Sequence, residues 1–116
     1  MISNKFRFHG HGSLKYVFAN GLAIRSSLFT VKYATNPRRH TPRLSVVVSK
    51  KVLKSAVGRN RIRRRLYELG RTEILPNLKN ITDVVIITTS SEVATLPATE
   101  LKTVLTGLFE QANLLK

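Results

Sequence analysis

The stretch SAVGRNRIRRRLYEL, residues Ser55–Leu69, holds five arginines within seven residues and has the apolar spacing of an amphipathic helix. Ile62, Leu66 and Leu69 recur at i, i+4 and i+7, which places them in a narrow stripe on one helix face. The arginines fall on the other faces, and the first acidic residue of the chain, Glu68, comes only near the end of the stretch. We therefore expect a helix that packs its stripe on a core and displays a dense cationic surface outward.

A cationic surface of this density favours a polyanionic ligand. Like charges at i, i+4 each cost an isolated helix about 0.2–0.5 kcal/mol, and a merely solvated basic face usually interleaves Glu with Lys. Arginine binds phosphate oxygens bidentately, whereas lysine acts as a point charge. Lys50, Lys51 and Lys54 precede the helix, and its N-terminus adds unpaired N–H groups and a positive dipole end. We interpret this segment as a nucleic-acid-binding surface.

The composition fits a small nucleic-acid-binding protein of the cytoplasm. The 116 residues are expected to form one domain over 1–116, with residues 1–12 as a flexible basic arm. The net charge is +14, and residues 1–67 contain sixteen lysines and arginines and no acidic residue. The chain has no cysteine, no apolar run of membrane-spanning length and no apolar core of a secretory signal at its start. We expect no membrane or disulfide partner.

Periodic segments along the rest of the chain predict an α+β fold, with a small sheet packed against helices. The run 83–89 is continuously β-branched, as in a central strand, and the C-terminal apolar residues recur at helical spacing. The basic helix is expected to continue toward Thr72 or Ile74 before Pro76 ends it. The predicted order is helix 14–20, strand 24–35, a hairpin connection at 36–42, strand 43–49, a short strand near Val52, the basic helix, strand 83–89 and a helix from Pro97 or Thr99.

The sequence lacks the residues of a nuclease active site. A metal-dependent nuclease needs clustered carboxylates to hold Mg²⁺ at the scissile phosphate, but the six acidic residues are scattered singly outside the basic half. His9 and His11 lie two residues apart with no cysteine or carboxylate nearby, and a structural zinc site needs about four ligands. We expect neither catalytic residues nor metal ligands in this chain.

The basic stretch and the strand before it resemble the signature of the bacterial ribonuclease P protein subunit. That signature is a strand ending in S-K-K and a helix reading A-V-x-R-N-x-x-K-R-x-x-R-E, and this chain has Ser49-Lys50-Lys51 and then AVGRNRIRRRLYE at 56–68. The resemblance covers most of the chain. It implies a two-layer sandwich similar to domain 2 of ribosomal protein S5, ordered α-β-β-(β)-α-β-α, with a left-handed β-α-β crossover in place of the usual right-handed one.

The resemblance also implies a function and a set of binding residues. The family's protein is a cofactor of a catalytic RNA, the ribonuclease P RNA, which removes the 5′ leader from precursor tRNA and holds most of the Mg²⁺. The carried-over RNA-binding residues are Arg59, Asn60, Arg61, Arg63, Arg64 and Arg65, with Lys50, Lys51 and Lys54 beside them. The carried-over residues of the leader-binding cleft are Leu14, Phe18 and Phe29, to which we add Arg7 and Ser49 from their own positions in the sequence.

The chain departs from the family pattern in two places, and two other functions stay open. The turn Val52–Ser55 is one residue longer than in the family and lacks its glycine, and Leu14 stands where the family has phenylalanine. A non-catalytic basic RNA-binding module, such as a ribosomal protein, would explain the charge but would not require the paired S-K-K and R-N-R motifs. A protein-only nuclease would need the carboxylate cluster that the sequence does not show.

Overall fold

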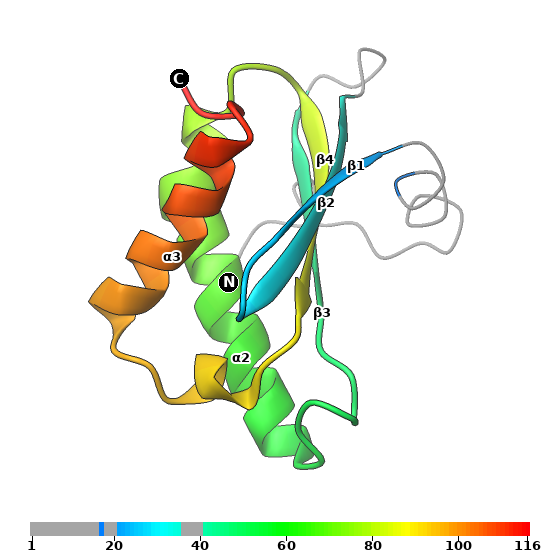
Figure 1. Cartoon of the computed structure of the whole chain (residues 1–116), viewed down its shortest axis with the longest axis vertical. Coiled ribbons are helices and arrows are strands. Elements are labelled where there is room, and N and C mark those ends of the chain that lie inside the picture. Colours follow the sequence, from blue (N-terminus) through cyan, green and yellow to red (C-terminus); the bar gives the residue numbers. More distant parts are fainter. Residues whose placement is uncertain (1–16, 18–20, 36–40) are drawn as a thin grey trace.

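The structure is a computed structural model that describes residues 17, 21–35 and 41–116. Within these residues, a four-stranded sheet is covered on one face by two α-helices (Figure 1). The predicted arm 1–12, the predicted helix 14–20 apart from Val17, and most of the predicted connection 36–42 lie outside the described residues. The elements are β1 Leu22–Arg25, β2 Phe29–Thr35, β3 Arg43–Val47, α2 Ala56–Leu69, β4 Thr82–Thr88 and α3 Ala98–Gln111.

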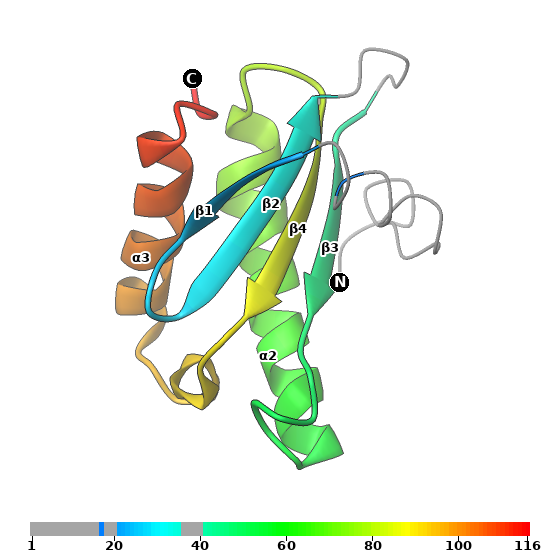
Figure 2. The same ribbon diagram turned by 45° about the vertical axis from the view of Figure 1, so that its right-hand side comes forward.

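The strands are arranged in the order β1-β2-β4-β3. β4 pairs antiparallel with β2 and parallel with β3, so α2 forms the crossover between the two parallel strands. In Figure 2, β3 and β4 both run downward in front of α2, and β3 lies to the right of β4. The crossover is therefore left-handed, the hand that the family resemblance implies and the opposite of the usual one.

The topology corrects three predictions about the strands. The predicted strand 24–35 is two antiparallel strands, because the Ser26 hydroxyl accepts hydrogen bonds from the N–H groups of Leu28 and Phe29, both at 3.2 Å, and closes a tight turn. Residues 36–42 do not join a hairpin, because β4 lies between β2 and β3. The segment near Val52 is a turn in place of the predicted short strand, with the Val52 N–H donating to the Ser49 carbonyl at 3.1 Å.

The main core lies between the sheet and the two helices. The strands direct alternate side chains to this layer, and both helices bury the apolar positions that recur at helical spacing, as predicted for the helices. Burying one large apolar side chain contributes about 1.5–3 kcal/mol to stability. The large, fully buried side chains of the main core are Phe29, Val31, Leu44, Ile62, Leu66, Ile74, Val84, Ile86, Leu101, Leu105 and Phe109.

The other face of the sheet carries a second, smaller apolar cluster. Val17, which is helical, is fully buried against Ala34 and Val85, with Val47 and Ile87 packed beside them. β4 is thus covered on both faces, as its continuous β-branched sequence predicted.

The end of α2 is held close to β3. A Cβ added at Gly70 would lie 2.2 Å from Cδ2 of Leu44, so a larger residue here would force the buried Leu44 side chain to shift. The chain continues as a π-helical turn over Gly70–Ile74 and a 3₁₀ turn over Leu75–Asn77 that contains Pro76. The expected continuation to Ile74 is confirmed, although as a π-helical turn after Leu69, whereas Pro76 does not end the helical path but lies within the 3₁₀ turn that follows.

Candidate nucleic-acid interface

The segment that leads from β3 into α2, residues 49–55, is named here the basic loop. Its last residue, Ser55, caps α2, and its hydroxyl accepts a hydrogen bond from the Gly58 N–H at 3.1 Å. A Cβ at Gly58 would lie 2.5 Å from Cδ2 of Leu53, so the loop folds back onto the first turn of the helix. The longer turn Val52–Ser55 is therefore accommodated by close packing at a glycine inside the helix.

The orientation of α2 agrees with the apolar stripe that defined it. Ile62 and Leu66 are fully buried and Leu69 is half-buried, whereas Arg61 and Arg64 are exposed. Asn60 is also exposed and accepts a hydrogen bond at 2.9 Å from Nη1 of Arg63. In the basic loop, Ser49, Lys50, Lys51 and Lys54 are all exposed.

The expectation of a fully outward cationic face holds for Arg61 and Arg64, whereas Arg59, Arg63 and Arg65 are half-buried, and two of these three donate to backbone carbonyls. Nη1 of Arg59 donates to the carbonyl oxygens of Leu53 at 2.9 Å and Lys54 at 2.7 Å. Arg65 donates from Nη1 to the Val93 carbonyl at 2.7 Å and from Nη2 to the Leu96 carbonyl, which ties α2 to the connection between β4 and α3. Burial lowers the pKa of Arg65, and the nearby charge of Arg61 lowers it further. Arg59 and Arg65 have backbone partners before any ligand binds.

Basic and polar side chains around the start of α2, all exposed except the half-buried Arg63, form one surface, which we call the basic surface. No acidic residue occurs in the sequence from 49 to 67. Glu68, at the far end, forms an ion pair with Arg71, which lowers the pKa of Glu68 and raises that of Arg71. The basic surface consists of Lys50, Lys51, Lys54, Asn60, Arg61, Arg63 and Arg64.

The residues predicted for a leader-binding cleft are only partly described. Arg7, Leu14 and Phe18 lie outside the described residues, and Ser49 is exposed just beyond the end of β3. Phe29 is a correction: it is 0% exposed in the main core, because the alternation of β2 directs it toward α2 and α3. The same alternation directs Lys32 to the opposite face, the one that carries Val17. The alternation of β2 could therefore have indicated Lys32, in place of Phe29, as the cleft residue.

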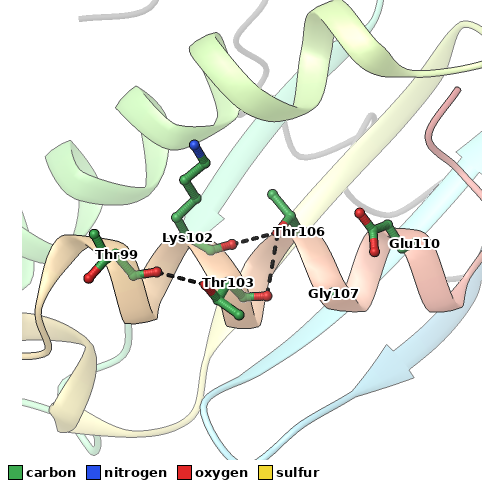
Figure 3. Close-up of a pocket in the computed structure, with 6 residues that line it drawn as sticks. All are labelled: Thr99, Lys102, Thr103, Thr106, Gly107 and Glu110. Atoms are coloured by element: carbon green, nitrogen blue, oxygen red, sulfur yellow. Dashed lines mark hydrogen bonds between the residues drawn. The ribbon is translucent and has the colours of Figure 1, made fainter.

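Other features of the described residues offer no competing site. They include no group of three or more histidines, cysteines or carboxylates, and no helix long and apolar enough to cross a bilayer. A shallow pocket lies along α3 (Figure 3), but the hydroxyls of Thr103 and Thr106 donate back to helix carbonyls, as Thr103 does to Thr99 at 2.9 Å. Lys102 at this pocket pairs with Glu73 at 3.2 Å. Its polar groups therefore do not converge on a ligand.

Comparison with known proteins agrees with this geometry. The family model described as Ribonuclease P matches residues 2–113. A ribonuclease P protein component from Pseudanabaena is 32% identical over 90 residues, covering 78% of this chain and 77% of the relative, and one from Synechococcus is 35% identical over 78 residues, covering 59% and 61%.

Solved structures share the fold. The RNase P protein of Staphylococcus aureus superposes with a TM-score of 0.83 at 20% identity, covering 96% of this chain and 98% of that one. The RNase P protein from Thermotoga maritima gives a TM-score of 0.79 at 22% identity, covering 90% and 96%. With a family model that spans nearly its whole length, the chain belongs to the ribonuclease P protein family.

Proposed function

We propose that this protein is the cofactor of a cytoplasmic ribonuclease P and that its basic surface binds the catalytic RNA. The observation that carries the proposal is the exposed set of lysines and arginines around the start of α2, in a segment with no acidic residue. Such a surface stays self-repelling in the free protein. RNA phosphates would remove that repulsion and accept the charge-assisted hydrogen bonds that the guanidinium groups donate.

We further propose that the sheet face opposite α2 and α3 binds the single-stranded 5′ leader of precursor tRNA. On this face Thr30 and Lys32 of β2 are half-buried, and exposed Ser49 lies just past the end of β3, beside the basic surface. Lys32 takes the place of Phe29 as the β2 residue of this cleft. Arg7, Leu14 and Phe18 are kept as candidates from the sequence.

The protein would act by positioning RNA. The described residues do not fit a Mg²⁺ site, because they bring together no group of three carboxylates or histidines, whereas Mg²⁺ prefers oxygen ligands in an octahedral arrangement. We assign the Mg²⁺ and the hydrolysis to the catalytic RNA. The contribution of this chain is to neutralise phosphates near the bound leader and to hold the leader in place.

Titration of a bacterial ribonuclease P RNA with the protein tests the basic surface. The double variant Arg61→Ala/Arg64→Ala should weaken binding and reduce the log–log salt slope by about 1.4–1.8, since each phosphate contact contributes about 0.7–0.9. Lys116→Ala is the control, because it removes an exposed positive charge at the other end of the chain. Equal salt slopes for the double variant and the control would contradict the proposed interface.

A further inference from the structure

The basic loop has a defined conformation, although repulsion among its positive charges disfavours a compact one. Three lysines lie within five residues, and no carboxylate is available in the loop or in the first turns of α2. Repulsion among these charges favours a spread and mobile segment. The structure shows instead a compact turn, in which the N–H groups of Val52 and Leu53 donate to the Ser49 carbonyl at 3.1 and 3.3 Å.

Arg59 joins this loop to the helix. Its Nη1 donates to two consecutive carbonyl oxygens, those of Leu53 and Lys54, at 2.9 and 2.7 Å. Its own backbone N–H donates to the Ser55 carbonyl at 3.0 Å, so the residue is fixed in the first turn of α2. A charged donor makes hydrogen bonds about twice as strong as neutral ones, and the planar guanidinium holds its donors in a fixed direction that an ammonium group lacks.

A second contact between the loop and α2 is made by the Leu53 side chain and does not involve the lysines. The Leu53 side chain packs over Gly58 and is partly buried against the main core. Lys54, which follows it, is exposed, and its carbonyl accepts the shorter of the two Arg59 bonds. Without the guanidinium, the bonds to the Ser49 carbonyl and the packed Leu53 side chain would remain, but the backbone at Leu53 and Lys54 would lose its hydrogen bonds to the first turn of α2.

We propose that Arg59 is a positioning residue, which holds the basic loop against α2 so that its three lysines and the exposed arginines meet the RNA as one preformed surface. This inference rests on the proposed function and gives Arg59 a role different from that of an ordinary phosphate ligand. A preformed loop loses less conformational freedom on binding, so the free energy of association suffers a smaller penalty. Loss of the two carbonyl bonds should weaken RNA binding about tenfold.

The first test measures amide hydrogen exchange in the free protein for Arg59→Lys and for the matched variant Arg61→Lys. Both keep the charge and remove a guanidinium, but Arg61 is exposed and donates no hydrogen bond within the described part of the chain. Arg59→Lys should speed exchange of the Val52 and Leu53 amides about tenfold, whereas Arg61→Lys should leave them unchanged. Arg59→Gln replaces the lysine variant if that variant fails to fold.

The second test measures affinity for a bacterial ribonuclease P RNA in a double-mutant cycle with Lys54→Ala. In the Arg59→Lys background, Lys54→Ala should cost less affinity than in the wild type, because the lysine is already displaced; in the Arg61→Lys background it should cost the same. Unchanged loop exchange, or equal Lys54→Ala costs in the Arg59→Lys and wild-type backgrounds, would overturn the positioning role. If the wild type binds no such RNA, the proposed function fails, and the exchange data still decide whether Arg59 holds the loop.

Discussion

Arg43 and Asp83 form an ion pair on the sheet face away from α2 and α3. Replacing Arg43 and replacing Asp83 are expected to lower the free energy of unfolding by different amounts. The two residues are directly opposite in the parallel register of β3 and β4. Nε and Nη2 of Arg43 donate to Oδ1 and Oδ2 of Asp83 at 2.9 and 2.7 Å. This bidentate bond raises the pKa of Arg43, although burial opposes the shift.

The loss of stability in each variant should increase with the burial of the charged side chain that remains after its partner is removed. The side chain of Asp83 is 1% exposed and that of Arg43 is 14% exposed. Removing one partner of a buried pair costs about 3–5 kcal/mol. Arg43→Ala leaves the more buried charge, so it should cost close to the upper value, and Asp83→Ala should cost about 3 kcal/mol, since water can reach the remaining guanidinium. At about 4 °C per kcal/mol for a chain of this length, the melting temperatures should fall by about 20 and 12 °C.

Guanidinium chloride and thermal unfolding at pH 7, followed by circular dichroism, would measure both variants. The double variant Arg43→Met/Asp83→Leu is the control, because an apolar pair of similar volume is often neutral or stabilising. A loss below about 1 kcal/mol for Arg43→Ala, or a larger loss for Asp83→Ala than for Arg43→Ala, would refute the reasoning from burial.

Three further substitutions test local features. Thr88→Val should stabilise the fold by about 1 kcal/mol in chemical denaturation, because the buried Thr88 hydroxyl has no hydrogen-bond partner among the described residues; a loss would point to a bound water. Gly107→Ala should raise stability by about 0.5–1 kcal/mol without changing RNA affinity, because nothing lies within 4 Å of the added Cβ on exposed α3, so a weaker complex would reveal a contact at this face. Tyr67→Phe should cost about 1–3 kcal/mol, because the buried Val46 N–H donates to the Tyr67 hydroxyl at 3.2 Å; unchanged stability would show that another acceptor replaces it.

The sequence predicted the elements better than their arrangement. The apolar periods of α2 and α3 and the β-branched run of β4 are strong local signals, and the structure confirms each of them. The turn at Ser26 was missed because it contains no glycine or proline and closes through a serine hydroxyl. The strand order could not be predicted locally, because the strand that separates β2 from β3 comes after α2 in the chain.

In the candidate site, too, local sequence patterns predicted which residues are exposed but not which distant residues they contact. Apolar spacing correctly predicted which face of α2 is buried and that Arg61 and Arg64 are exposed. It could not show that Arg65 donates to carbonyls 28 and 31 residues away, since those partners are brought near by the fold. Phe29 and Val31 lie two residues apart in β2 and therefore share a face of the sheet, and assigning Phe29 to a cleft overlooked that this shared face is the core.

Removal of the 5′ leader from a precursor tRNA at low Mg²⁺ tests the proposed cofactor role most directly. The reaction compares the protein alone, a bacterial ribonuclease P RNA alone, and the two together. We predict fast cleavage only for the combination, with most of the gain lost in Arg61→Ala/Arg64→Ala. No gain with any such RNA would contradict the cofactor role, and cleavage by the protein alone would contradict the assignment of the chemistry to the RNA.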